Sequence, residues 1–234
     1  MYIKWINIRV GKLKRICNLF LGGEYIHLIE YIPIESSEVM KLDYPERELV
    51  NKSKNGDMDA FSELISSYEK KIYNIALRMI GNREDAYDMA QEVCIKIYKN
   101  INSFKGDSSF STWVYRITSN VCIDEIRKKK YAMPLTMVND SAKEFEIPIE
   151  SHNSLPEDII ERKEKIKDIK KCIIELPPEY RIMIILRDIR GHSYEEISNI
   201  LNLNMGTVKS RLSRARAILK DKLKNMEQIR NQIV

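Results

Sequence analysis

The feature that most constrains the fold is a pair of predicted helices joined by a tight turn, at residues 193–223. Ser193 and Glu196 have the spacing of a capping box, which marks the start of the first helix. Asn202 falls where the chain must turn, and asparagine tolerates the left-handed conformation better than most residues do. Asn204 is a suitable N-cap for a second helix that begins directly after it.

The second helix has an apolar side and a basic side when it is placed on a wheel at about 100° per residue. The residues expected to face a core are Val208, Leu212, Ala215, Leu219 and Leu223. The residues on the outward face and its edges are Lys209, Ser210, Arg211, Ser213, Arg214, Arg216, Ala217, Lys220 and Lys222. Small residues allow close approach to a major groove, arginine can fork onto guanine, and flanking cations can contact phosphates. The pattern predicts a DNA-binding helix-turn-helix, whereas an isolated basic helix would more often be a solvated surface.

The composition is that of an ordinary globular protein, with 44% hydrophobic and 31% charged residues. The net charge of +5 permits a polyanionic partner without requiring one. The sequence contains no Walker loop, dinucleotide fingerprint or zinc motif. We therefore expect a recognition protein that is not an enzyme and that uses no cofactor and no metal.

The cysteines and histidines do not form a recognisable site. Cys94, Cys122 and Cys172 lie among apolar neighbours at helical spacing, so we expect buried free thiols rather than ligands or disulfides. His192 directly precedes the predicted cap at Ser193, and we expect it to be exposed.

Residues 1–42 differ from the rest of the chain, since basic and apolar residues alternate without a clean helical period. The apolar run 16–23 is too short for a membrane span, and no small-residue cleavage site follows it. A basic amphipathic helix on a membrane surface is one interpretation of this extension. We favour another, in which Met40 is the true start and the preceding 39 residues are translated upstream sequence or a disordered tail.

Residues 43–131 are predicted to form consecutive helices separated by polar breaks, with stops at Gly56 and Gly81 and a cap at Asn82. The helix predicted at 83–101 has a polar side, which in most helices is simply solvated. The charged and amide residues on that side are Asp88, Gln91 and Glu92.

The segment 104–130 combines aromatic and basic side chains. A polar loop that contains glycine lies between Phe104 and Phe110, and the following helix carries Trp113 and ends in a basic run. Aromatic faces and cations are what single-stranded nucleic acid needs from a binding surface. Phe110 and Trp113 would also suit a hydrophobic core, so both interpretations stay open.

Residues 132–156 contain three prolines and an acidic middle, and are predicted to be a linker. Residues 157–228 then form a second helical domain, in which Pro177–Pro178 end the first helix. The predicted fold is all-α, with two small helical domains joined by a flexible linker, the second containing the helix-turn-helix.

Two sequence blocks in this order resemble the extracytoplasmic-function (ECF) sigma factors of the sigma-70 family. The first block is FKGDSSFSTWVYRITSNVCIDEIRKKK at 104–130. The second combines ELPPEYRIMIILRDIRGHSYEEISNIL at 175–201 with GTVKSRLSRAR at 206–216. The similarity covers about residues 46–224, and Ser198 departs from the alanine that is usual in the family.

The resemblance implies a cytoplasmic transcription initiation factor of the stress-response type, which binds core RNA polymerase and helps to open promoter DNA. Residues 43–131 would be sigma region 2, which binds the polymerase and the melted −10 element. Residues 157–228 would be sigma region 4, which reads the duplex −35 element. By family habit we expect an anti-sigma factor, which could be membrane-bound, and no stable homo-oligomer.

The resemblance also implies roles for individual residues. Asn120 falls where the family captures a flipped −10 base, and its amide can both donate to and accept from a base edge. The −10 residues would be Phe104, Lys105, Asn120, Arg127, Lys128, Lys129 and Lys130. The −35 residues would be Lys209, Ser210, Arg211, Ser213, Arg214 and Arg216. The core polymerase interface would include Asp88, Gln91 and Glu92.

Two alternatives come from other functional classes. A dimeric helix-turn-helix regulator that is not a polymerase subunit would explain the second domain equally well, but not the aromatic and basic segment 104–116. A nucleic-acid enzyme such as a recombinase would need a nucleophile or a carboxylate cluster with a supporting motif, and the sequence has neither.

Overall fold

The computed structural model describes residues 44–132 and 156–233, and these two ranges contain helices and connecting turns without any strand. The predicted all-α class is confirmed. The expectations for the extension 1–42, for Met40 and for the interior of the linker 132–156 fall outside the described residues. Within the described ranges, no helix combines the length and the apolarity needed to cross a membrane.

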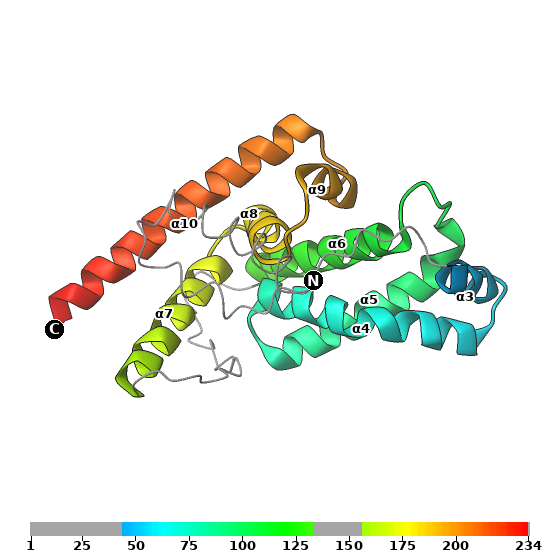
Figure 1. Cartoon of the computed structure of the whole chain (residues 1–234), viewed down its shortest axis with the longest axis horizontal. Helices are drawn as coiled ribbons and strands as arrows, with labels where there is room; N and C mark the ends of the chain where they lie inside the picture. The colour runs from blue at the N-terminus through cyan, green and yellow to red at the C-terminus, as the bar shows by residue number, and fades with distance from the viewer. Residues whose placement is uncertain (1–43, 133–155, 234) are drawn as a thin grey trace, which may run out of the picture.

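The first helical group contains the helices of residues 44–132 (Figure 1). Its elements are α3 (Tyr44–Lys54), α4 (Met58–Ile80), α5 (Arg83–Asn100), the short 3-10 helix η1 (Ile101–Ser103) and α6 (Phe110–Ala132). Helix α4 packs against α3, α5 and α6. It ends at Gly81, which adopts the left-handed conformation, and Asn82 then caps α5 by accepting hydrogen bonds from the backbone of Glu84 and Asp85. The predicted helix boundaries here are confirmed.

The second helical group contains the helices of residues 156–233. Its elements are α7 (Pro156–Ile174), α8 (Pro178–Ile184), the π-helical turn η2 (Ile185–Ile189), α9 (Tyr194–Leu201) and α10 (Met205–Ile233). Pro178 stands in the first turn of α8, where the missing N–H costs nothing. The sequence pattern gave no sign of the π turn, in which the N–H of Arg190 donates to the Ile185 carbonyl at 2.9 Å.

The two groups share one hydrophobic core, and α6 lies beside α8 and α9 (Figure 1). The fully buried side chains Ile72 and Met79 of α4 belong to the same cluster as Met183 and Leu186 of the second group. A pair of domains joined by a linker would ordinarily have two separate cores. The apolar faces of α4 and α6 are instead covered by the second group.

The helix-turn-helix forms as the sequence predicts. The Ser193 hydroxyl accepts from the Glu196 N–H, and the Glu196 carboxylate accepts from the Ser193 N–H, which completes the capping box. Asn202 adopts φ 51° and ψ 51°, in the left-handed region. The Asn204 side chain accepts from the Thr207 N–H at 2.7 Å and caps α10. In the turn, the hydroxyl of Ser198 donates to a backbone carbonyl, which accounts for a hydroxyl where the family usually has alanine.

The recognition helix α10 is tied to η2 by an ion pair between Asp188 and Arg216. Arg216 Nε donates to Asp188 Oδ2 at 3.1 Å, its Nη2 contacts the other carboxylate oxygen, and each side chain is only 16% exposed. Next to this pair, the guanidinium of Arg187 lies 4.8 Å from the ring centre of Tyr194 at the start of α9. These contacts fix the angle between the two helices of the motif.

The expectation that His192 is exposed was wrong. Its side chain is 5% exposed, and its ring packs edge-on against Tyr115 of α6 at 5.3 Å between centroids. The burial comes from the other helical group, whose contact the local sequence does not encode. On its own side His192 Nδ1 lies 3.8 Å from Glu196 Oε2.

We expect the capping box to make the protein sensitive to acid. The His192 imidazole and the hydrogen bonds from Ser193 lower the pKa of Glu196 from its ordinary value of 4.5 to about 2. A carboxyl whose pKa is depressed on folding stabilises the fold above its unfolded pKa, and that stabilisation is lost as the pH falls from about 4.5 towards 2. Urea unfolding at pH 5 and pH 3 should show a smaller pH dependence for Glu196→Gln than for the wild type. Glu195→Gln, at the exposed neighbouring position, should keep the wild-type dependence, and equal behaviour of the two variants would contradict this assignment.

We expect Asp188→Ala to lower the free energy of unfolding by about 3 kcal/mol, because it removes one partner of an ion pair that is largely screened from water. Glu175→Ala is a matched control, since Glu175 pairs with Lys222 at 2.7 Å on the exposed surface of the same helical group. Its loss should be below about 1 kcal/mol. Equal losses in urea unfolding would show that the Asp188 pair contributes no more than a surface pair.

Candidate nucleic-acid interface

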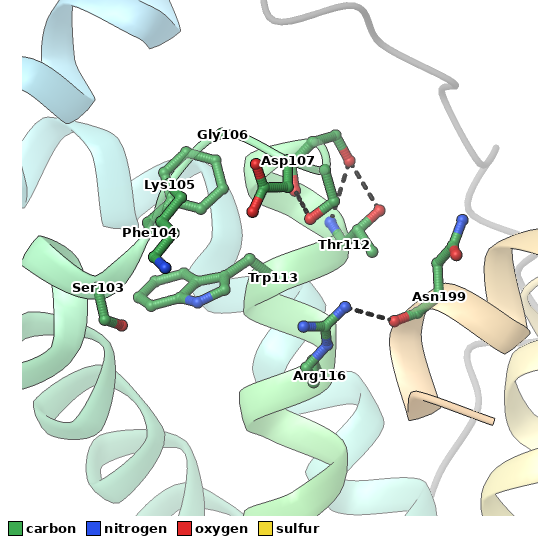
Figure 2. Close-up of a pocket in the computed structure, with 11 residues that line it drawn as sticks. Ser103, Phe104, Lys105, Gly106, Asp107, Thr112, Trp113, Arg116 and Asn199 are labelled. Carbon is green, nitrogen blue, oxygen red and sulfur yellow. Dashed lines mark hydrogen bonds between the residues drawn. The ribbon is translucent and has the colours of Figure 1, made fainter.

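A pocket of about 350 Å³ lies between the loop that follows η1 and the first turns of α6 (Figure 2). Its lining consists of Ser103, Phe104, Lys105, Gly106, Asp107, Ser108, Ser109, Thr112, Trp113, Arg116 and Asn199. The lining thus combines aromatic rings, two cations, a carboxylate and several hydroxyl groups. The volume falls at the lower end of the range for small-molecule sites, roughly 300–1,000 Å³.

The two aromatic rings that line the pocket, Phe104 and Trp113, belong to a larger aromatic cluster. Phe104 and Phe110 are buried, and Trp113 is half-buried, with its ring centre 5.5 Å from each of the two phenylalanine rings. Phe110 also meets Tyr68 of α4 edge to face at 5.5 Å. Phe104 and Phe110 thus belong to the core as one interpretation expects, and Phe104 and Trp113 also line the pocket. The nucleic-acid interpretation stays a prediction.

The loop is held in shape by its own hydrogen bonds. Gly106 has φ +85°, a left-handed conformation that other residues rarely adopt. Ser109 accepts a hydrogen bond from the Thr112 N–H at 3.2 Å, and its hydroxyl also contacts the hydroxyl of Thr112 at 2.8 Å. Lys54 of α3 donates to the Phe104 carbonyl at 2.5 Å from the other side. The rim of the pocket is thereby anchored to both α3 and α6.

The second helical group supplies one wall of the pocket. Arg116 Nη2 donates to the backbone carbonyl of Asn199 in α9 at 2.7 Å, and Figure 2 shows this bond at the edge of the site. The pattern of the sequence gave no indication that a residue of the helix-turn-helix would lie here.

The predicted −10 residues are only partly brought together. Phe104 and Lys105 line the pocket, whereas Asn120 is exposed one helical turn beyond Arg116 and does not line it. Positions four residues apart share a face of α6, so Asn120 continues the surface that starts at the pocket. These roles stay predictions.

The basic run at the end of α6 is exposed at Arg127, Lys128 and Lys129, and Lys130 belongs to the same helix. Two of these cations make ion pairs within the protein. Arg127 Nε donates to the Glu179 carboxylate of α8 at 3.0 Å, and Lys129 Nζ lies 2.9 Å from Asp85 of α5.

The predicted −35 residues lie on α10 with different surroundings. The exposed members are Lys209, Ser210, Ser213 and Arg214, and Arg211 is half-buried. The opposite side of the helix is buried at Val208, Leu212 and Ala215 as the wheel predicts. Arg216 belongs to the ion pair with Asp188, so the structure places it as a residue that orients the helix.

The predicted polymerase-binding residues share the outer side of α5. Asp88 and Gln91 are exposed, and Glu92 is half-buried with Lys96 Nζ at 3.3 Å. The same side carries two exposed apolar residues that sequence analysis missed, Tyr87 at 59% and Ile95 at 53% exposure. The sequence did contain a signal for these two residues. Tyr87, Gln91 and Ile95 are spaced four residues apart, which places them on one face of the helix, and that face lies outside the buried stripe.

The described cysteines are free and none is placed to react. Cys122 and Cys172 are buried, and Cys94 is half-buried. Burial raises the pKa of Cys122 to about 12 and that of Cys172 to about 11. The prediction of buried free thiols is confirmed for Cys122 and Cys172, whereas Cys94 is free but only half-buried. Within residues 44–132 and 156–233, no group of three or more histidine, cysteine or acidic side chains could hold a metal ion.

Two parts of the chain match sigma factor families. Residues 64–131 match Sigma-70 region 2, and residues 166–219 match Sigma-70, region 4. The ECF RNA polymerase sigma factor SigW of Bacillus subtilis is 40% identical over 179 residues, which cover 76% of this chain and 96% of that protein. The ECF RNA polymerase sigma-E factor of Escherichia coli K12 is 34% identical over 177 residues, which cover 75% and 92%.

Solved structures agree with these matches. The sigma factor RpoE of Bartonella quintana, in complex with the anti-sigma factor NepR, is 27% identical with a TM-score of 0.50 over 70% of this chain and 96% of that one. CnrH, in complex with the cytosolic domain of CnrY, has the same fold, with a TM-score of 0.53 at 20% identity over 77% and 98%. The family matches account for both helical groups, whereas the dimeric regulator accounted only for the second. The chain therefore belongs to the ECF sigma factors of the sigma-70 family, which direct RNA polymerase to promoters and initiate transcription.

Proposed function

We propose a division of labour between the two helical groups. Residues 43–131 bind core polymerase and the melted −10 element, and residues 157–228 bind the duplex −35 element. The protein acts in the cytoplasm and catalyses no reaction of its own. The observation that supports this best is the pocket of aromatic rings, cations and hydroxyls on the same chain as a helix-turn-helix with an exposed basic face.

In the −10 function, the pocket receives a base that has left the stack. Trp113 offers an aromatic face, and Lys105 and Arg116 offer positive charge to the neighbouring phosphates. Asn120 contacts the base edge or the adjoining nucleotide from the next turn of α6. Lys128 and the rest of the basic run hold the backbone further along the strand.

In the −35 function, α10 enters the major groove with its exposed residues against the bases. Lys209, Ser210, Ser213 and Arg214 face the base edges, and Arg211 lies beside the phosphates. Val208 and Leu212 hold the other side of the helix on the core, so the helix enters the groove as a rigid unit.

Core polymerase docks on the outer side of α5. Asp88, Gln91 and Glu92 supply polar contacts, and Tyr87 and Ile95 supply the apolar area that a stable interface needs at its centre. An anti-sigma factor is a further expected partner. The similar structure of RpoE is a complex with the anti-sigma factor NepR, and that of CnrH is a complex with the cytosolic domain of CnrY.

Run-off transcription tests the function directly. Purified bacterial core polymerase should produce new transcript starts on fragments of the source genome when this protein is added, and the starts should share −10 and −35 sequences. Tight duplex binding by the protein alone, without new starts, would instead support a dimeric regulator.

We expect Arg214→Ala to weaken recognition of the −35 element by about 1–3 kcal/mol, because the exposed guanidinium contacts a base edge. Competition binding of the holoenzyme to promoters with single −35 substitutions measures the effect. Lys224→Ala removes an exposed cation further along α10 and should leave the sequence preference unchanged. An unaltered preference in Arg214→Ala would remove this residue from base recognition.

Asn120→Ala and Gln91→Ala should separate DNA opening from polymerase binding. We expect Asn120→Ala to reduce the permanganate reactivity of unpaired thymines in the −10 region while polymerase affinity stays at the wild-type value. Gln91→Ala should lower the affinity for core polymerase, measured by fluorescence anisotropy. At saturating protein it should leave the permanganate reactivity of the −10 thymines at the wild-type value. A parallel loss of affinity in Asn120→Ala would show that this amide has a structural role.

A further inference from the structure

We propose that Lys54 of α3 is a positioning residue for the pocket, and that it sets the geometry in which the loop 104–109 meets an unpaired −10 base. This inference rests on the proposed assignment of the pocket to the −10 element. Helix α3 lies outside residues 64–131, the part of the chain that matches Sigma-70 region 2.

Lys54 joins the end of α3 to the start of the loop. Its Nζ donates to the Phe104 carbonyl at 2.5 Å, and the same nitrogen lies 5.5 Å from the centre of the Phe104 ring. The Lys54 side chain is half-buried, so water competes with this bond less than it would at the surface. The Phe104 ring is buried in the core, and Lys54 fixes the carbonyl, hence the direction in which the chain leaves that core.

The position of Lys54 is itself fixed relative to α4. Lys54 is the last residue of α3, and the turn that follows contains Gly56 in the left-handed conformation, with φ +89°. The N–H of Asp57 donates to the Lys52 carbonyl at 3.1 Å, and the Asp57 carboxylate accepts from two N–H groups in the first turn of α4. Lys54 thus gives the loop a firm attachment to a helix of the core.

The loop depends on this attachment because its other hydrogen bonds are local. At its far end, Ser109 accepts from the Thr112 N–H at 3.2 Å, within the first turn of α6. Between the two ends, Gly106 has φ +85°, and a Cβ built there would have no atom within 4 Å. Lys105 and Asp107 on either side of it are exposed. The course of the loop is therefore set mainly by where its two ends are held.

A second contact from α3 acts on the same aromatic cluster. The Tyr68 hydroxyl donates to the carboxylate of Glu46 near the start of α3, and the Tyr68 ring meets Phe110 edge to face at 5.5 Å. The Phe110 ring centre lies 5.3 Å from that of Phe104 and 5.5 Å from that of Trp113. Burial and the Glu46 carboxylate raise the pKa of Tyr68, so its hydroxyl keeps the proton that it donates. Both ends of α3 thus contact residues that shape the pocket.

Two simpler roles for Lys54 lead to different expectations. A cation in the last turn of a helix is favourable against the helix dipole, and Lys52 occupies the same turn. Lys52 pairs with Glu48 at 2.8 Å on the surface, so it shares the charge and the helix-end position of Lys54 without the loop contact. It is therefore a matched control. The other simple role is a direct contact between Lys54 and a DNA phosphate.

Fluorescence quenching tests the positioning in the full chain without DNA. Trp5→Phe leaves Trp113 as the single tryptophan, and the Trp113 ring centre lies 5.5 Å from that of Phe104. Acrylamide is neutral, so the loss of a cation does not by itself change its approach. We expect the quenching constant to rise about twofold in Lys54→Met, because the loop opens more often, and to stay unchanged in Lys52→Met. Lys54→Arg retains a charged donor and should restore most of the protection.

Binding of a single-stranded oligonucleotide to the holoenzyme tests the consequence for function. One oligonucleotide carries the −10 sequence of a promoter found by run-off transcription, and a second has those bases substituted. Lys54→Met should lower the affinity for the matching strand about five- to tenfold and narrow its advantage over the substituted strand. Lys54→Arg should regain most of this affinity, and Lys52→Met should match the wild type. The affinity for core polymerase and the slope of log affinity against log salt should stay at their wild-type values.

Several results would overturn the role of Lys54. A salt slope smaller by about 0.7 in Lys54→Met would show that Lys54 binds a phosphate itself. Equal quenching and equal binding in Lys54→Met and Lys52→Met would reduce Lys54 to a helix-end cation. Loss of the folded state in Lys54→Met, measured by circular dichroism, would show that Lys54 supports the whole fold instead of the pocket.

The same measurements separate this role from the proposed function. Increased quenching in Lys54→Met, with unchanged −10 binding in a holoenzyme that initiates transcription, would leave α3 as a support for the loop and overturn the assignment of the pocket to the −10 element. Absence of any polymerase-dependent transcript with the wild type would overturn the proposed function itself.

Discussion

The packing of the two helical groups depends on a buried cation, Arg181 in the last turn of α8. Its side chain is 7% exposed, and its two terminal nitrogens donate to the carbonyls of Met79, Ile174 and Leu176. The carbonyls of Met79 and Ile174 lie at the C-terminal ends of α4 and α7, where a helix leaves its acceptors without partners and its dipole is negative, and Leu176 lies in the turn that follows α7. Burial lowers the pKa of Arg181 to about 10, so the guanidinium stays charged at neutral pH. A single side chain thus completes two helix ends that belong to different parts of the chain.

The position of the helix-turn-helix follows from this contact. With Arg181 held against α4, helix α8 leads into η2, where Asp188 orients α10 through Arg216. The residues that follow η2 then meet α6, since Arg190 bonds to Tyr115 and His192 packs on the same ring. Helix α9 therefore comes to lie at the pocket, where Asn199 forms part of the lining. The place of the recognition motif is set by side chains outside the motif itself.

Sequence reasoning succeeded where the physical cause is local. The capping box at Ser193, the left-handed turn at Asn202 and the buried side of α10 all depend on neighbours within a few residues. It failed where the cause is a distant partner. The burial of His192 requires α6, and the pairing of Arg216 requires Asp188, 28 residues earlier in the chain. The wall that α9 gives to the pocket likewise required the packing of the two groups. The assignments carried over from the family remain proposals for the same reason, because they concern contacts with molecules outside the chain.

Two arginines, Arg116 and Arg127, are bound within the protein and are also proposed to bind DNA. In this structure the guanidinium of Arg116 donates to a backbone carbonyl and that of Arg127 to a carboxylate, whereas in the proposed complex both would face phosphates. A phosphate accepts two parallel hydrogen bonds from one guanidinium, and its neutralisation releases counterions. Exchange of the protein acceptors for DNA phosphates is therefore favoured at low salt.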